Sequence, residues 1–422
     1  MTTPNGAIVF NASTGSDSAA SGLGPATAQT GSGASTDGTA VVTGITTTGV
    51  SAGDLLWVQT ASGRQFSIIA SVDSGTQVTC DDTFVLGSGQ TWAIGGKRAT
   101  FDNADSRQAF TDAATLKWVF ETETSQTITS TIVIDEVVIV GTSTDPSTRQ
   151  TVDCSASNTH NFQSSGGNVF RNIKFTNSNA TKTSGSGYRI AANGTSVFVN
   201  CEFGDATDKL YNATSRSTGV DNIEFHNCFI HNTVGNGISM GGNTQPKIFN
   251  TVFYKTGDVA ASMSNGVTWM VGCVFLDCGG SNAFVSNREC KILNTMFHTA
   301  TGGVSFDGGV IVNCVFYNLT TGFNATSVTN ASIYDHNYFG SVTTHAVISG
   351  NGESTNEQTL TADPCVDATN GDATLNETSG GGADLRSAAV TLGSTETRPF
   401  RWLDTSTGGA TLASDARIER LK

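Results

Sequence analysis

The chain has 422 residues, a formal net charge of −14 and a sequence isoelectric point near 4.7. This acidity argues against nucleic acid as a partner, because binding to the phosphate backbone needs a cationic surface. No stretch approaches about 18 consecutive apolar residues, so we expect no membrane-spanning helix. Glycine is abundant, with 48 residues, and charged residues make up only 14%, which favours many short strands joined by tight turns.

The N-terminal segment, MTTPNGAIVFNASTGSD, has no basic stretch followed by an apolar one, so we expect no secretory signal peptide. Four runs follow that are apolar or alternate between apolar and polar residues, and turns separate them. They predict strands at Asp54–Val58, Phe66–Val72, Gln77–Cys80 and Thr91–Ile94. The sequence therefore predicts an N-terminal strand and Gly/Ser-rich segment over residues 1–38 and a small β-barrel or sandwich over residues 39–100.

Residues Asp105–Ala114 are the best short helix in the chain. Asp105 followed by Gln108 resembles a capping box, and Phe110 supplies an apolar face. A repetitive β-structure must cover its open ends, because an uncovered last strand is an aggregation edge. We expect this helix to cap the N-terminal end of the repeats that follow.

One short pattern recurs along residues 170–338, and we number it from an asparagine at position 0. Chance does not produce eight copies of one template, and successive copies lie about 22 residues apart. Position 0 is occupied by Asn172, Asn200, Asn227, Asn250, Gly272, Asn294, Asn313 and Asp335. Position −2 is occupied by Phe170, Phe198, Phe225, Ile248, Met270, Ile292, Ile311 and Ile333. Position +1 is occupied by Ile173, Cys201, Cys228, Thr251, Cys273, Thr295, Cys314 and His336, and position +3 by Phe175, Phe203, Ile230, Phe253, Phe275, Phe297, Phe316 and Tyr338.

This repeat predicts an all-β fold, a right-handed parallel β-helix solenoid, over residues 101–350 with the capping helix included. Positions +1 and +3 alternate as one inward face of a strand, and position −2 also points inward, so the asparagine between them must lie at a bend. Asparagine tolerates the left-handed backbone conformation, and stacked asparagine amides can hydrogen-bond to one another along the axis. Leucine-rich repeats share the period but not these residues.

Nine cysteines form no C-x-x-C pair, and the lone C-x4-C of Cys273 and Cys278 is a poor zinc signature. We interpret the cysteines at position +1 as small apolar core residues that stay reduced. A disulfide between Cys201 and Cys228 is the less favoured alternative. Because histidines 226, 231, 298 and 336 are scattered over the repeats, we expect no metal site and no cofactor.

With these repeats, the chain resembles the pectate-lyase-like right-handed β-helix repeat proteins. FNASTGSDSAASGLGPATA resembles their first strand and glycine-rich turn, and ADPCVDATNGDATLNETSGGGADLRSAA, at residues 362–389, resembles the segment that ends them. The resemblance implies either a secreted polysaccharide-degrading enzyme or a bacteriophage virion protein. We assign residues 351–422 to a C-terminal cap and tail, in which the aromatic and basic end from Glu396 either closes the solenoid or contacts a partner.

Few acids stand on the repeats, and the nearest grouping, Glu202, Asp205 and Asp208, supplies the weak catalytic candidates. Together with the expected lack of an export signal, this favours a non-enzymatic bacteriophage structural protein, either a capsid decoration or head fibre or a tail fibre. Such a protein is assembled in the host cytoplasm and resides in the virion. The resemblance implies a homotrimer that contacts other virion proteins, with a host surface glycan as a further partner. A tailspike-type polysaccharide lyase or glycoside hydrolase is the alternative, and a non-catalytic glycan-binding adhesin is the third.

Overall fold

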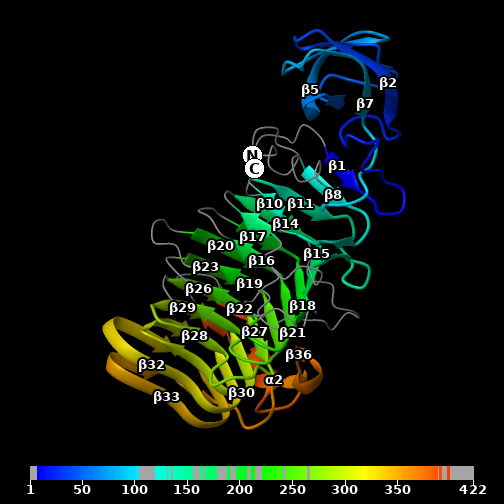
Figure 1. Cartoon of the computed structure of the whole chain (residues 1–422). Coiled ribbons are helices and arrows are strands. Elements are labelled where there is room, and N and C mark those ends of the chain that lie inside the picture. The colour runs from blue at the N-terminus through cyan, green and yellow to red at the C-terminus, as the bar shows by residue number, and fades with distance from the viewer. Residues whose placement is uncertain are drawn as a thin grey trace. The chain divides into compact units, whose positions relative to one another are not determined.

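The structure is a computed structural model of the whole chain (Figure 1). It describes residues 7–103, 119–130, 132–134, 136–154, 162–164, 167–177, 188–190, 196–206, 211–213, 221–240, 244–263, 267–387, 389–391 and 397–399. The chain forms two compact units, one of residues 2–157 and 161–174 and the other of residues 158–160 and 175–422. Each unit is described by itself.

The first unit contains a closed β-barrel of six antiparallel strands in the order β2-β3-β6-β5-β4-β7. The strands are β2 (Gln29–Thr36), β3 (Val41–Thr43), β4 (Leu55–Thr60), β5 (Gly63–Ser74), β6 (Gln77–Cys80) and β7 (Gly87–Ile94). Its core includes Val58, Ile69, Val78 and Trp92, which are buried together. The predicted small barrel is confirmed, and β2 lies before residue 39, so the barrel takes in part of the segment expected to precede it.

The rest of the first unit is parallel β-structure. Its strands are β1 (Ala7–Phe10), β8 (Val119–Thr122), β9 (Gln126–Thr127), β10 (Ile132–Ile134), β11 (Val138–Gly141), β12 (Gln150–Asp153), β13 (Phe162–Ser164) and β14 (Asn168–Arg171). Strand β8 lies between β1 and β11 and pairs in parallel with both. The N-terminal strand therefore belongs to the solenoid, although a whole barrel separates it from β8 in the sequence.

The second unit is a parallel β-helix with three walls, and the division between the units falls within β15 (Ile173–Asn177). The first wall consists of β17 (Ser196–Val199), β20 (Asp221–His226), β23 (Thr244–Phe249), β26 (Thr268–Val271), β29 (Cys290–Leu293) and β31 (Gly309–Val312). The second wall consists of β18 (Glu202–Ala206), β21 (Phe229–Thr233), β24 (Val252–Thr256) and β27 (Val274–Leu276), and the third of β16 (Tyr188–Ile190), β19 (Tyr211–Ala213), β22 (Ile238–Met240), β25 (Ala261–Met263) and β28 (Phe284–Ser286). The longer strands β30 (Met296–Phe306), β32 (Val315–Asp335) and β33 (Tyr338–Thr355) each run along more than one wall, and β34 (Gln358–Thr359) follows them (Figure 1).

The predicted bend lies at position 0 and has the expected left-handed backbone. Asn200 and Asn313 both have φ of 53°, and Gly272 has φ of 67°. The Asn250 amide donates to Asn227 at 3.2 Å and the Asn313 amide donates to Asn294 at 2.7 Å, so part of the predicted amide ladder forms. Gly272 has no side chain to continue the ladder between these two pairs.

A second left-handed corner lies five positions after the first, between the second and third walls. Its members all have φ between 49° and 55°: Asn232, Lys255, Asp277, Thr299, Asn318 and Ser341. Asparagine occupies only two of these six positions, so the column has no common residue type that a sequence pattern could reveal.

In the last of the eight copies the predicted register is wrong by one residue. Strand pairing aligns Val312 with Asp335, and the left-handed residue is His336, with φ of 52°. The residues that point inward are therefore Tyr334, Asn337 and Phe339, and Ile333 is 57% exposed. Ile333 and Asp335 match the residue types of positions −2 and 0, so the pattern alone favours the wrong register. The observed register buries Tyr334 and Phe339 and thereby removes more apolar surface from water than the predicted register would.

In the seven earlier copies, as far as the structure describes them, the residues at positions −2, +1 and +3 are buried in the core as predicted. The phenylalanines at position +3 stack along the axis, with ring centroids 4.5 Å apart between Phe253 and Phe275 and 4.8 Å apart between Phe275 and Phe297. The position +1 thiols of Cys273 and Cys314 contact backbone carbonyls of the same and the preceding turn. All nine cysteines of the chain are free and buried, so the structure does not contain the alternative disulfide.

We expect Cys201, Cys228, Cys273 and Cys314 to react with alkylating reagents only after unfolding, because each has at most 3% of its surface exposed. Peptide mapping of natively alkylated protein would measure this. A Ser74→Cys variant is a matched positive control, because Ser74 is exposed on the barrel. Modification of the four core cysteines as fast as the thiol introduced in that variant would contradict their placement.

The C-terminal strap, residues 360–387, folds back over the outer face of the second wall. It contains β35 (Cys365–Asp367), η1 (Ala368–Asn370), β36 (Asp372–Leu375) and α2 (Gly382–Ser387), and Figure 1 shows β36 and α2 beside β27 and β30. Leu360, Leu375 and Leu385 are buried against outward-facing Leu276 and Met296. The Tyr254 hydroxyl donates to the Thr369 carbonyl at 3.0 Å. The strap therefore buries an apolar outer face that would otherwise be exposed to water.

Some expectations lie outside the described residues. These are the capping helix at Asp105–Ala114 and the tail from Phe400 onward. Between the strap and that tail, the structure describes an antiparallel hairpin of β37 (Ala389–Thr391) and β38 (Thr397–Pro399). Among the helices that the structure describes, none has the length and apolarity needed to cross a membrane.

Candidate functional site

The outer face of the first wall carries an aromatic and charged surface, which we call the outer ladder. Residues 247 and 249 of β23 flank the buried Ile248, so their side chains point outward. Strand pairing places Trp269 next to Lys247 on one side and Lys291 on the other. The outer ladder consists of Glu224, His226, Lys247, Phe249, Trp269 and Lys291.

The side chains of the outer ladder contact one another along the axis. Lys247 Nζ lies 2.7 Å from Glu224 Oε1, and His226 Nε2 lies 3.0 Å from Glu224 Oε2. The His226 ring stacks on Phe249 with centroids 4.9 Å apart, and Lys291 Nζ lies 4.3 Å from the Trp269 ring centroid. Trp269 is 41% exposed. Burial raises the pKa of Glu224, but the hydrogen bonds from Lys247 and His226 outweigh it and leave the pKa below its ordinary value.

This arrangement combines an exposed indole with fixed charged groups on a rigid sheet. An exposed aromatic ring offers an apolar surface to a ligand, while the neighbouring ammonium and carboxylate groups offer hydrogen bonds. Because neighbouring strands are about 4.8 Å apart, the outer ladder presents these groups at regular intervals along the solenoid. Such a surface can bind an extended polymer of alternating apolar and polar faces.

Among the three weak catalytic candidates, Glu202 is the one whose side chain the structure describes. Glu202 lies on β18, where its Oε1 is 2.9 Å from His231 Nε2 and only 8% of the residue is exposed. Phe229 stacks on the His231 ring with centroids 4.3 Å apart. A Cβ atom at Gly204 would lie 2.4 Å from that ring, so glycine is needed for the pair to form.

Of the three acids, the structure describes the side chain of Glu202 alone. Asp205 belongs to β18, but its side chain is not described, and Asp208 lies outside the described residues. What the structure assembles around Glu202 is a buried carboxylate–imidazole pair on the second wall. The sequence missed this pair, although Glu202 and His231 occupy positions +2 and +4 of neighbouring copies, both of which point outward.

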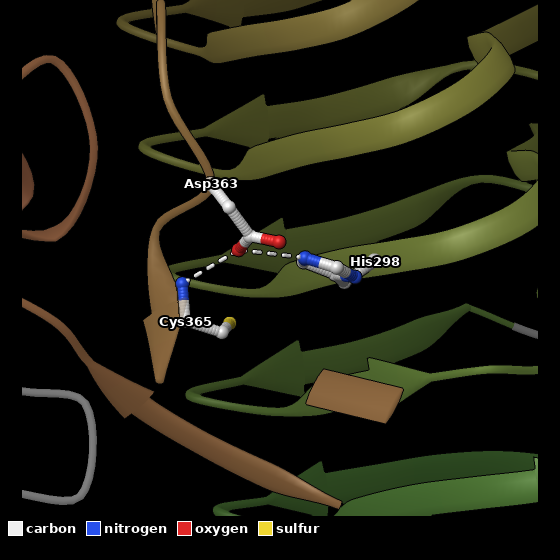
Figure 2. A group of neighbouring side chains, drawn as sticks. All are labelled: His298, Asp363 and Cys365. Atoms are coloured by element: carbon white, nitrogen blue, oxygen red, sulfur yellow. Dashed lines mark hydrogen bonds and ion pairs between the residues drawn. The ribbon is translucent and has the colours of Figure 1, made fainter. Parts of the chain in front are cut away.

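A third group joins the strap to the second wall. His298 of β30, Asp363 and Cys365 have one ligand atom each within 4.8 Å of one another, and Figure 2 shows the three side chains pointing toward a common centre. His298 Nε2 lies 3.0 Å from Asp363 Oδ1, which also accepts a 2.8 Å hydrogen bond from the Cys365 amide. His298 and Cys365 are each 4% exposed. These are the residues of the described chain that could hold a metal ion.

Comparison with known proteins yields similarities to solved structures. No protein-family profile and no curated protein matches the chain. Pectate lyase Pel9A has 12% identity and a TM-score of 0.41 over 73% of this chain and 88% of its own. Geobacillus virus E2 ORF18 has 13% identity and a TM-score of 0.37 over 57% of this chain and 52% of its own. The gp54 tailspike of Acinetobacter baumannii bacteriophage AP22, solved with a capsular saccharide, has 12% identity and a TM-score of 0.21 over 79% of this chain and 66% of its own.

At these identities and TM-scores the similarities concern the fold alone. Successive strands of each wall pair in parallel, and the second unit is the parallel β-helix that its repeats predict.

Proposed function

We propose that this protein is a bacteriophage virion protein that binds a cell-surface glycan on the outer ladder without cleaving it. The observation that carries the proposal is Trp269, exposed on a rigid wall between Lys247 and Lys291. A pyranose ring has an apolar face that packs on an indole, and its hydroxyl or carboxylate groups accept hydrogen bonds from lysine.

The virion location is supported by the repeats, which resemble those of bacteriophage β-helix proteins. Attachment to the capsid or the tail and assembly as a homotrimer belong to the same proposal. Binding without cleavage is supported by the position of Glu202, whose carboxylate contacts His231 and has little exposed surface. A general acid or base must reach the bond that it protonates or the water that it activates.

We expect Trp269→Ala to weaken binding to the cognate glycan by about tenfold or more, as for an aromatic residue at the centre of an interface. A bacterial glycan array identifies the ligand, and titration calorimetry measures its affinity for each variant. Ile333→Ala is the matched control, because Ile333 is an exposed apolar residue of the same wall and column, aligned with Val310. This control should bind as tightly as the unchanged protein.

Equal binding by both variants would contradict the placement of the site on the outer ladder. The same polysaccharides, incubated with the protein and assayed for new reducing ends or unsaturated products, test the enzymatic alternative. Products that disappear in Glu202→Gln would replace the proposed function by a lyase or hydrolase activity at the Glu202–His231 pair.

A further inference from the structure

His298, Asp363 and Cys365 form a ligand set whose composition suits a divalent transition metal. Zinc binds imidazole nitrogen, carboxylate oxygen and thiolate sulfur at about 2.0–2.3 Å, which places neighbouring tetrahedral ligands about 3.3–3.8 Å apart. The three ligand atoms already lie within 4.8 Å of one another. They come within zinc-binding distance after movements of about 1 Å, which a change in one side-chain torsion supplies.

The surroundings of the group orient it for a metal. His298 Nδ1 lies 2.8 Å from Thr299 Oγ1, which leaves Nε2 directed at Asp363. Metal-ligating histidines are held in this manner by a hydrogen bond to the second ring nitrogen. Two ligands are buried, while the Asp363 side chain is 49% exposed. A metal ion can therefore enter from the side of Asp363, and water can supply a fourth ligand there.

The Cys365 thiol lies in the apolar contact between the strap and the second wall. Cys365 Sγ lies 3.4 Å from Met296 Sδ, inside the cluster between the strap and the second wall. Metal binding replaces the thiol proton, which passes to solvent.

We propose that His298, Asp363 and Cys365 form a zinc site that fastens the C-terminal strap to the second wall. Its ligands come from segments about 65 residues apart, so the ion cross-links the strap to the solenoid. The site is separate from the outer ladder, which lies on the first wall. It also departs from the expectation, based on scattered histidines, that the chain has no metal site.

The test uses the full-length protein, freed of metal with a chelator and then titrated with Zn²⁺ alone. We expect one zinc ion to bind per chain, the thermal unfolding midpoint to rise with zinc concentration, and Co²⁺ to give a thiolate-to-metal charge-transfer absorption. Cys365→Ser should abolish the cobalt band, and Asp363→Asn should weaken zinc binding by at least about tenfold. Far-ultraviolet circular dichroism establishes that each variant is folded.

Two controls separate this site from adventitious binding. Asp367→Asn removes an exposed carboxylate from the same strap, and Cys80→Ser removes a buried thiol in the barrel. Both should bind zinc as the unchanged protein does. Failure of the unchanged protein to bind stoichiometric zinc, or equal binding by Cys365→Ser, would overturn the proposal. The His298–Asp363 hydrogen bond would then be one of several contacts between the strap and the second wall.

Discussion

Replacing Phe275 by alanine is expected to lower the free energy of unfolding of the second unit by about 3–5 kcal/mol. Phe275 is 1% exposed and lies in the middle of the phenylalanine stack, between Phe253 and Phe297. Truncation would remove both ring contacts and leave a cavity that the two neighbouring turns cannot fill, because their own side chains are fixed by the strand register. Urea denaturation followed by circular dichroism measures the change.

Phe229→Ala is the matched control for this experiment. Phe229 is on the same wall but points outward, with 37% of its surface exposed. Its removal leaves no enclosed cavity, so we expect a loss below about 1.5 kcal/mol. If the two variants lost similar stability, the stack of inward phenylalanines would not be the source of the effect.

The second large effect is expected at alkaline pH. Burial raises the pKa of Cys273, Cys278 and Cys314 from the ordinary value of 9.0 to about 12. Between these values the unfolded chain has lost thiol protons that the folded chain retains. The stabilisation is therefore complete below pH 9 and is lost as the pH rises toward 12. Each thiol contributes about 1.4 kcal/mol per pH unit, or about 4 kcal/mol per pH unit for the three.

Urea unfolding at several values between about pH 8 and 11, in the presence of a reducing agent, measures this slope. Lysine and tyrosine side chains titrate in the same range, so the comparison must be made with a variant. Cys273→Ala should unfold with a slope about 1.4 kcal/mol per pH unit smaller than that of the unchanged protein. A slope that does not change would mean that Cys273 is not protected from ionisation by burial.

In the last copy of the repeat, the residue pattern alone predicts the wrong strand register. Ile333 and Asp335 fit the template, yet the strands align Tyr334 with Ile311 and place His336 at the corner. A shift of one residue exchanges the inner and outer faces of a strand, so local pattern and burial compete directly. In the earlier copies asparagine or glycine marks the corner, and the register there was predicted correctly.

The outer face of the second wall carries a signal that the template did not use. Strand β27, Val274-Phe275-Leu276, is apolar at every position, and all three residues are buried. A continuous apolar run, in place of an alternating one, indicates a strand covered on both faces. The sequence could have shown that this wall is covered, but not which segment covers it.

The sequence by itself determined the parallel β-helix, the inward columns of phenylalanine and cysteine, the asparagine corner and the small barrel. These features depend on residues near one another in the chain or on their repetition, through strand alternation and the left-handed tolerance of asparagine. Only the tertiary structure decided that the strap lies on the second wall, that Glu202 contacts His231, and that Trp269 stands between two lysines. Each of these depends on side chains from different turns or segments, as Tyr254 and Thr369 illustrate at a separation of 115 residues. No local preference encodes such contacts, because they form only when separate apolar and polar surfaces become complementary in the folded chain.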